Sequence, residues 1–354
     1  MTIIDRYIVR AVLAATGLVM AVLLVLAVLI IFIGEQGDVG QGHYTAFSAL
    51  WYSLLSMPQA AWELLPIGAL LGSLLGLGQL ARNSELIVLR ASGVSVARIA
   101  GSALIAGLIL LAVEVVLGEL LATQLEQTAN AQKALDRFSN LSFGSSGAWV
   151  RDGNTILNVE HLTGRGRFGG MLLFQLSPDH RLVSIGHAEH ASPVSKGHWV
   201  LDGYTESRFK DNGVQAGSAG ERMLVSHLTA SFLSFATAPL RNLTVRALWT
   251  LIEYDRANAL DPGQYLFAFW SRIARTLAIA FAVLLGVPFV LGALRTAAAG
   301  SRMMVGLVLG IVLFLLQRLI ESGTVVFNLN PIVLAWIPTA LLAAVTLVLL
   351  ARAR

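Results

Sequence analysis

Long apolar runs alternate with short polar breaks along most of the chain. A helix needs roughly 20 mostly apolar residues to span a bilayer. The runs of sufficient length predict six spanning helices, at about 9–33, 50–80, 97–122, 266–292, 303–321 and 331–351. The first run is too long for the apolar region of a signal peptide, and no small-residue cleavage pattern follows it.

Between the third and fourth runs the pattern changes to short strands. From about Phe143 to Phe235, apolar and polar residues alternate in segments separated by Gly, Pro, Asn and Asp, which is typical of antiparallel strands. The sequence Asp152-Gly153-Asn154 predicts a hairpin turn. About a hundred residues of this kind favour a sandwich, a jelly roll or a partly open barrel.

The two patterns together predict a membrane α-helical bundle of six transmembrane helices with an inserted all-β, jellyroll-like domain. We expect five segments along the chain. They are the first three spanning helices (1–122), a helical extension or linker (123–142), the β domain (143–240), a linker returning to the membrane (241–265) and the last three spanning helices (266–354).

Arginines at the ends of the apolar runs predict the orientation. Cytoplasmic loops of membrane proteins carry an excess of Lys and Arg. With the N-terminus inside, the inner ends hold Arg6, Arg10, Arg82, Arg90, Arg98, Arg295, Arg302, Arg352 and Arg354. The outer loops 34–49 and 322–330 hold no Lys or Arg. Both termini are therefore expected in the cytoplasm and the β domain outside. Because the arginines are scattered, no nucleic-acid partner is expected.

Composition restricts the chemistry that this chain can perform. It has 354 residues, 56% of them hydrophobic and only 13% charged, and it has no cysteine. Neither disulfides nor thiolate metal sites can therefore stabilise the external part. None of the lysines (Lys133, Lys196 and Lys210) follows a glycine, so the chain cannot supply a GxxxxGK[ST] phosphate loop. Any ATP must be hydrolysed by another subunit.

Motifs for other chemistry are weak. His187 and His190 fit neither the HExxH nor the HxxEH zinc spacing, and on a strand they would point to opposite faces. No metal site is therefore predicted, and no GxSxG elbow is present. An intramembrane enzyme acting on a lipid head group would need a pair of catalytic groups at one depth, which Glu114 alone does not provide.

Small residues and charges inside the spans each allow two interpretations. Glycines at four-residue spacing let helix backbones approach closely, either within the bundle or at a partner interface or sliding gate. These are Gly68, Gly72, Gly76, Gly306 and Gly310. Charged residues near the outer ends of the spans either pair with one another or line a vestibule that binds an anionic head group. These are Glu63, Glu114, Glu119, Arg272, Arg275, Arg318 and Glu321.

The polar break between the second and third spans predicts a helix of its own. Asn83 or Ser84 can cap this helix, Glu85 lies favourably in its first turn, and Gly93 supplies its stop. The pattern predicts a two-turn cytoplasmic helix over 84–93.

The apolar side chains of this helix suggest two environments. Leu86 and Leu89 share a face with Arg90. The helix either inserts into a socket on a partner or lies on the lipid surface.

Several motifs, in order along the chain, resemble one family. They are "DRYI" at 5–8, "GQGHY" at 40–44, "SELIVLRASG" at 84–93, "FWSRI" at 269–273 and "PFVLGALR" at 288–295. On these motifs the chain resembles, nearly end to end, the permease family of the lipopolysaccharide export ABC transporter (LptF/LptG). The LptG branch is matched better than the LptF branch.

This resemblance implies a transport subunit of the bacterial inner membrane with a periplasmic β-jellyroll, and not an enzyme. It implies a paralogous LptF-like permease as partner, a dimeric LptB-like ATPase that holds ATP and Mg, and LptA- and LptC-like bridge and bitopic proteins. The chain itself would bind no cofactor. Lipopolysaccharide would enter from the outer leaflet, between the first helix of one permease and the fifth of the other, and leave towards the bridge. A permease for another envelope lipid or for lipoprotein release is the alternative, and a scaffold without transport is a further one.

The resemblance also assigns site residues. The coupling helix to the ATPase would use Ser84, Glu85, Leu86, Leu89, Arg90, Ser92 and Gly93, with Glu85 as the main polar contact. Candidates for the lateral gate are Thr16, Gly17, Met20, Phe314 and Arg318. Candidates for lipid binding are Lys133, Arg137, Arg272, Arg275, Arg318 and Phe314. Relatives can carry lysines just beyond the first helix, but loop 34–49 here has none.

Overall fold

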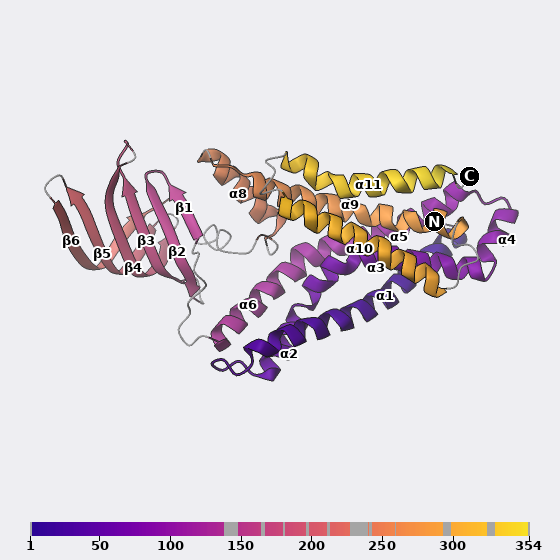
Figure 1. Cartoon of the computed structure of the whole chain (residues 1–354), viewed down its shortest axis with the longest axis horizontal. Coiled ribbons are helices and arrows are strands. Elements are labelled where there is room, and N and C mark those ends of the chain that lie inside the picture. Colours follow the sequence, from indigo (N-terminus) through magenta and orange to yellow (C-terminus); the bar gives the residue numbers. More distant parts are fainter. Residues whose placement is uncertain are drawn as a thin grey trace. The chain divides into compact units, whose positions relative to one another are not determined.

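The computed structural model describes residues 2–137, 148–163, 167–179, 181–195, 198–210, 213–226, 240, 243–258, 260–292, 299–323 and 330–352. For some residues inside these ranges only the backbone is described. Figure 1 labels the helices and strands that these residues form. The chain divides into two compact units, a helical unit (1–37, 49–129 and 263–354) and a second unit that contains the strands (38–48 and 130–262).

The helices form two groups along the chain, separated by the strands. The first group is α1 (Ile3–Glu35), the 3₁₀ turn η1 (Gln36–Asp38), α2 (Ala46–Leu55), α3 (Met57–Arg82), α4 (Glu85–Ala91), α5 (Val96–Val116), the π-helical turn η2 (Leu117–Ala122) and α6 (Thr123–Arg137). The second group is α8 (Val245–Ala257), α9 (Gly263–Leu291), α10 (Ala299–Gly323) and α11 (Pro331–Arg352).

The long helices agree with the six predicted spans. Within the described residues, five helical stretches are long and apolar enough to cross a membrane, and they contain α1, α3, α5, α9 and α11. The helix α10, with 25 residues, covers the remaining predicted span. The prediction of a single second helix over 50–80 is wrong, because α2 ends at Leu55 and α3 begins at Met57. Pro58 lies in the first turn of α3, where the missing N–H of proline costs no helical hydrogen bond.

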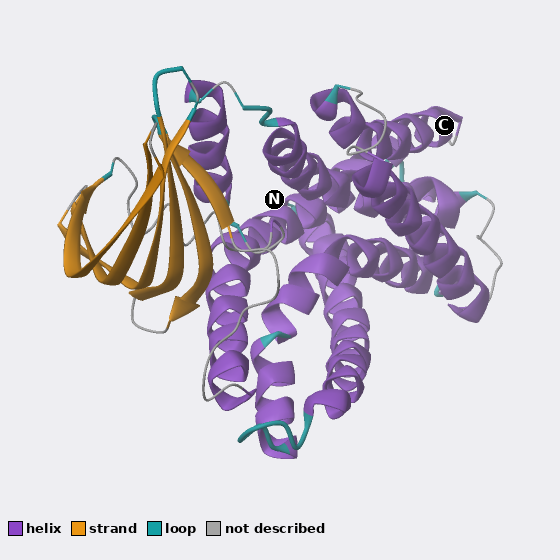
Figure 2. Ribbon diagram, turned by 60° about the vertical axis from the view of Figure 1, so that its left-hand side comes forward, coloured by secondary structure: helices purple, strands orange, loops and turns teal. Residues whose placement is uncertain are grey.

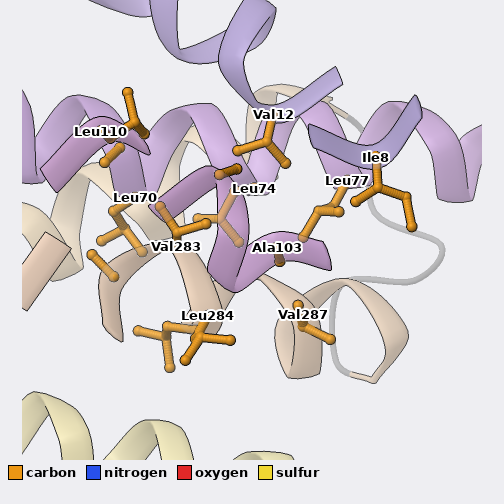
Figure 3. Close-up of a cluster of buried hydrophobic side chains, with 14 of the residues drawn as sticks. Ile8, Val12, Leu70, Leu74, Leu77, Ala103, Leu110, Val283, Leu284 and Val287 are labelled. Atoms are coloured by element: carbon orange, nitrogen blue, oxygen red, sulfur yellow. The ribbon is translucent and has the colours of Figure 1, made fainter. Parts of the chain in front are cut away.

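The helix α3 lies at the centre of the helical unit, in contact with α1, α9 and α10. In its most apolar window 67% of the residues are buried, against 11% in α1, which places α1 at the edge of the bundle. Figure 3 shows part of the core between α1, α3, α5 and α9, with Ile8, Val12, Leu70, Leu74, Leu77, Ala103, Leu110, Val283, Leu284 and Val287 labelled.

Glycines let α1 and α10 pack closely against α3. A Cβ atom built on Gly76 would lie 2.7 Å from the carbonyl oxygen of Ala11, and one on Gly72 would collide with Thr16. A Cβ on Gly310 of α10 would lie 3.0 Å from Ile67. Packing of helices within one chain, the first of the two interpretations of these glycines, is therefore confirmed.

The strands form one antiparallel sheet in sequential order. They are β1 (Ala148–Asp152), β2 (Thr155–Thr163), β3 (Arg167–Leu176), β4 (Leu182–Ser195), β5 (His198–Lys210) and β6 (Gly213–Val225). Each strand pairs with the one before it (Figure 1), so the described strands form a meander. The predicted inserted all-β domain is thereby confirmed, and its described strands lie in one antiparallel sheet.

The local turn chemistry of the sheet was predictable. Asp152 pairs with Thr155 across the hairpin predicted at 152–154, and Gly153 has a φ of 58°. The first turn residue of a two-residue hairpin often needs this positive φ, which suits glycine. The sheet is curved (Figure 2). The Ser226 hydroxyl, just after β6, donates a 2.6 Å hydrogen bond to Asp152 at the end of β1.

The segment predicted as a linker at 241–265 contains the helix α8. Thr244 caps it by accepting a hydrogen bond from the backbone N–H of Ala247, and Leu248, Leu251 and Ile252 are buried. Spacings of three and four residues bring apolar side chains to one helical face, a pattern that the linker prediction overlooked.

Candidate functional site

The first candidate site is the short helix α4, predicted over 84–93 and observed over Glu85–Ala91. Its end agrees with the prediction. Gly93 has a φ of 92°, and the Val94 N–H donates to the carbonyl of Leu89 at 3.0 Å. A left-handed glycine and this bond are features of the Schellman motif.

The start of α4 differs from the prediction. Ser84 has a left-handed backbone with a φ of 61°, and its side chain makes no capping hydrogen bond. Asn83 does not cap the helix either, because its side-chain amide donates to Glu85 Oε1 at 3.1 Å. A non-glycine residue with positive φ is uncommon and costs conformational energy.

Contacts at Glu85 join α4 to the first helix. The Tyr7 hydroxyl donates a 2.6 Å hydrogen bond to Glu85 Oε2. The residue expected to contact a partner thus holds two internal hydrogen bonds. A carboxylate has further lone pairs, so these bonds leave acceptor capacity for a partner.

The apolar side chains of α4 divide differently from the prediction. Leu86 is only 2% exposed and belongs to the core of the helical unit, and Leu89 packs against that core. The expectation that Leu86 fills a socket on a partner is therefore corrected, whereas the contact predicted for the half-buried Leu89 stays a prediction. Val88 and Ile87, at 65% and 43% exposed, are the apolar side chains that α4 presents outward.

The second candidate site, the Trp62 cluster, consists of Trp62, Glu114, Glu119, Arg272 and Arg275. It joins the first turns of α3 to the end of α5, the turn η2 and the first half of α9. Arg272 Nη1 donates to Glu119 Oε1 at 3.0 Å, and Arg275 Nε lies 3.5 Å from Glu114 Oε1. Of the two interpretations of the intramembrane charges, pairing with one another holds for these four residues. Both arginine side chains are largely buried, so neither presents an open lipid-binding surface.

Aromatic contacts complete the Trp62 cluster. The guanidinium carbons of Arg275 and Arg272 lie 3.4 Å and 4.7 Å from the centroid of the Trp62 ring, within the range of cation–π attraction. A Cβ on Gly118 would lie 3.1 Å from Trp62 Cε2 and closer still to other ring atoms. Sequence reasoning missed Trp62, although its position beside Glu63, near the outer end of a predicted span, could have suggested it.

In the second unit, Lys133 of α6 has a partner that the sequence did not predict. Its ammonium lies 3.0 Å from Asp38 Oδ2 and 6.0 Å from the centre of the Tyr44 ring. The loop that carries no cation thus contributes a carboxylate to this lysine. The side chain of Arg137, the second candidate here, lies outside the described part of the structure.

The lateral-gate candidates have different environments. Thr16 and Met20 are buried, and both face the glycines of α3, whereas Gly17 is exposed. Thr16 and Met20 therefore form intrachain contacts and no open gate surface. The side chains of Phe314 and Arg318 lie outside the described residues. From Leu18 onward, the large exposed apolar residues of α1 are Leu18, Val22, Val25, Leu26, Leu29, Ile30 and Ile33.

The fold defines a class of protein: a multi-pass membrane protein with an antiparallel β unit inserted between its third and fourth long apolar helices. The particular family follows from comparison with known proteins. The model of the lipopolysaccharide export system permease family LptF/LptG matches residues 6–352, and the chain belongs to this family.

Individual relatives agree with this family. The lipopolysaccharide export system permease protein LptG of Escherichia coli (strain K12) is 30% identical over 354 residues, covering 99% of this chain and 98% of the relative. The LptG protein of Haemophilus influenzae is 28% identical over 355 residues, an alignment that covers 99% of this chain and 99% of the relative. The resemblance to the LptG branch is thereby confirmed.

Proposed function

We propose that this chain is the permease subunit of an ABC transporter that extracts lipopolysaccharide from the outer leaflet of the inner membrane and passes it to a periplasmic bridge. The match of residues 6–352 to the permease family carries this proposal. As a permease the chain is a transport component of the lipopolysaccharide export system and not an enzyme. ATP would be hydrolysed by a separate subunit.

The geometry of α4 supports a role in coupling to that ATPase. The helix is anchored on its inner side by Leu86 and tied to α1 through Glu85, while Ile87 and Val88 face outward. A short helix fixed on one side can transmit a push from a partner to the bundle without bending independently. We propose that Ile87, Val88 and the exposed Arg90 make the contact, with Glu85 at its edge.

The apolar surface of the helical unit supports a lipid path. Extraction exposes acyl chains at a cost of about 0.8 kcal/mol per CH₂ unless another apolar surface covers them. The exposed side of α1, around Leu18, Val22 and Leu29, provides such a surface. We propose that this side, rather than Thr16 or Met20, meets the fifth spanning helix of a paralogous permease and forms the lateral gate. Cations such as Lys133 would meet the lipid phosphates.

Membership of the permease family also supports a set of partner subunits and an orientation in the membrane. We propose a heterodimer with an LptF-like permease, a dimeric LptB-like ATPase in the cytoplasm and LptA- and LptC-like proteins as the bridge. The arginine asymmetry described above favours cytoplasmic termini and a periplasmic β unit.

Purification from the native membrane tests this function. Every protein and lipid that co-purifies with the chain would be identified by mass spectrometry, and ATP-dependent lipid release would be measured after reconstitution into proteoliposomes. We expect lipopolysaccharide and an ATPase subunit in the complex, and release that requires ATP. Recovery and release of another envelope lipid or of a lipoprotein would overturn the substrate. Purification without any ATPase would overturn the coupling role of α4.

A further inference from the structure

We propose that α2 is an interfacial helix, whose exposed apolar face rests among lipids at the membrane surface. It lies at the end of α3 opposite α4 (Figure 1). The helix then forms neither the outer part of a spanning helix nor a contact with another subunit. This position goes beyond the proposed transport function, because it does not depend on which lipid the complex exports.

The side chains of α2 are distributed in the opposite way from those of a surface helix in a soluble protein, which turns its apolar face to the core. The buried residues of α2 are the small Ala49 and Ser53. Its outward face carries four large side chains that are between 42% and 73% exposed, Phe47, Leu50, Trp51 and Leu54. Spacings of three, four and seven residues place these side chains on one side of the helix. Such an exposed apolar face marks a surface that lipid or protein covers.

The length of α3 determines the depth at which α2 ends. The uncharged part of α3 after Glu63, residues 64–81, is about 27 Å long at 1.5 Å per residue. This length is close to the roughly 30 Å of a hydrocarbon core. The side chains of Gln59 and Glu63, joined by a 3.1 Å hydrogen bond, therefore mark the level at which the hydrocarbon ends. The helix α2 lies beyond this level in the chain, and its 10 residues are too few to span a bilayer.

The break between α2 and α3 keeps α2 near this level. A straight continuation of α3 would carry α2 about 12 to 25 Å beyond Glu63, whereas the interfacial layer is only about 5–8 Å thick on each side. The apolar face would then lie in water. The helix ends instead at Leu55, and α3 begins at Met57 with Pro58 in its first turn, which has no N–H for the carbonyl of Leu54. The interruption allows α2 a direction of its own, within the interface.

The neighbouring segments bring α2 to the bilayer. The stretches Ile3–Asp38 and Met57–Arg82, which precede and follow it, are both long and apolar enough to cross a membrane. Only residues 39–45 and Ser56 separate α2 from these stretches. The membrane in which both stretches lie can therefore cover the apolar face.

The chemistry of the face favours lipid over a protein partner. Between Asp38 and Glu63 the chain has no Lys, Arg, Asp or Glu, so α2 offers no charge that could select a partner. The hydroxyl of Ser53 donates to the carbonyl of Ala49 within the helix, at 2.8 Å. Of the four outward side chains only that of Trp51 has a hydrogen-bonding group. Tryptophan is enriched at membrane–water interfaces, where one end of its ring system is apolar and the other is wet.

Single spin labels on the full-length chain test this position. The chain has no native cysteine, so labels can be attached at Leu50→Cys and, separately, at Leu54→Cys. Leu341→Cys, exposed in the middle of α11, is the control for hydrocarbon, and Glu221→Cys, exposed on β6, is the control for water. The complex would be reconstituted into vesicles of phosphatidylethanolamine and phosphatidylglycerol. Collision rates would be measured with oxygen, which partitions into lipid, and with a water-soluble nickel chelate.

We expect the ratio of oxygen to chelate collisions at Leu50 and Leu54 to lie between the ratios at Leu341 and Glu221, because the interface lies between hydrocarbon and water. A ratio equal to that of Glu221 would place α2 in water. A ratio equal to that of Leu341 would place it inside the hydrocarbon. Rare collisions with both reagents would mean that a protein covers the face. Each of these three results would overturn the interfacial position.

Photocrosslinking identifies the molecule that touches the face. A photoreactive benzophenone amino acid at Leu54 would be activated in the same vesicles, with and without lipopolysaccharide, and the adducts would be identified by mass spectrometry. We expect phospholipid adducts in both samples. Adducts with another subunit would replace the bilayer by a protein partner. Adducts that form only with lipopolysaccharide would assign the face to the transported lipid, and either result would overturn the proposal.

Release of lipopolysaccharide by the unlabelled complex, measured in the same vesicles, separates this position from the transport function. Release by a complex whose labels at Leu50 and Leu54 are covered by protein would overturn the interfacial position and leave the transport function intact. Absence of release, with labels at the depth of the interface, would overturn the transport function and leave α2 at the membrane surface.

Discussion

The hydroxyl of Tyr7 and the carboxylate of Glu85 lie 2.6 Å apart, which joins the start of α1 to the start of α4. The two residues come from the motifs "DRYI" and "SELIVLRASG", which are far apart in the chain. α1 has the smallest buried share of the five helical stretches long and apolar enough to cross a membrane in the described part of the chain, and it is the helix proposed to line the lateral gate. This hydrogen bond is therefore a direct route by which a push on α4 by an ATPase would reach the proposed gate helix.

Tyr7→Phe should weaken this link without unfolding the bundle. The phenyl ring keeps its packing, and only an exposed hydrogen bond is lost, so we expect the melting temperature to fall by less than about 2 °C. ATP hydrolysis by the assembled complex should become less dependent on lipopolysaccharide. Asn83→Ala, which removes the other hydrogen bond to Glu85 but no contact with α1, is the matched control. Unchanged stimulation of the ATPase in Tyr7→Phe would show that the bond has no part in coupling.

Substitutions on the two sides of α4 should affect different properties, stability on the inner side and recovery of the ATPase on the outer side. Leu86→Ala leaves a cavity in the core, at a cost of about 2–5 kcal/mol, and should lower the melting temperature of the chain. Val88→Ser changes an exposed side chain and should leave the melting temperature unchanged but reduce the amount of ATPase that co-purifies. Both quantities are measured on the same preparations, by thermal unfolding and quantitative mass spectrometry.

The reverse result would contradict this division of α4. If Leu86→Ala lost the ATPase without loss of stability, Leu86 would have to face the partner in the assembled complex, as the sequence first suggested. Wild-type recovery of the ATPase with Val88→Ser would remove Val88 from the contact.

Gly72→Ala should destabilise the packing of α1 against α3. The added methyl group would collide with Thr16, and overpacking of this kind costs about 1–3 kcal/mol. Gly101→Ala in α5 is the matched control, because a Cβ there meets nothing within 4 Å and alanine favours helix by about 1 kcal/mol over glycine. Thermal unfolding should therefore show a decrease for the first variant and no decrease for the second. If the two variants had equal melting temperatures, α1 would be able to move away from the added methyl group at little cost in stability.

Features that depend on local sequence were predicted well. The hairpin at Gly153 and the helix stop at Gly93 follow from the backbone freedom of glycine, and both have positive φ. The long helices follow from the length of the apolar runs. Pairing of Glu119 with Arg272 was one of the two interpretations left open. It could be anticipated because an unpaired charge inside a membrane has a high free-energy cost.

Features that depend on contacts between distant segments were not predictable. The residues from Leu86 to Leu89 are all apolar, so periodicity cannot tell which side of a seven-residue helix faces the bundle. The π form of η2 has no sequence signal of its own. Its contacts are with Trp62 and Arg272, which are distant from η2 in the chain. The partner of Lys133 was missed for the same reason, since Asp38 comes from another segment.

The stability of the strand pair β5–β6 should depend on pH through Glu206. Burial raises the pKa of this carboxyl, but hydrogen bonds from Arg208 and Ser184 and the charge of Arg222 outweigh it, so that the pKa is lowered. A group with a lowered folded-state pKa stabilises the protein above its unfolded value of about 4.3, and this contribution is lost as the pH falls through the folded value. Hydrogen exchange of β6, corrected for intrinsic rates, should therefore show less protection below about pH 4.

Two variants separate Glu206 from the general effect of acid. Glu206→Gln should reduce the protection of β6 at neutral pH and remove its dependence on this titration. Glu221→Gln, an exposed change on β6 itself, should behave as the wild type. The same acid profile in all three proteins would assign the pH dependence to other groups.

Tyr254→Phe should expose the edge strand β1. The hydroxyl of Tyr254 in α8 accepts a hydrogen bond from the Arg151 N–H at 2.7 Å and donates one to the Arg151 carbonyl oxygen, so it occupies both groups that an edge strand would otherwise leave open. Each bond contributes about 1 kcal/mol, and their loss should increase hydrogen exchange at Arg151 by roughly one order of magnitude or more. Thr250→Val is the matched control, because that hydroxyl bonds the Arg246 carbonyl within α8 itself. If both variants left exchange at Arg151 unchanged in the full-length protein, α8 would not protect this edge, and another part of the chain would have to cover it.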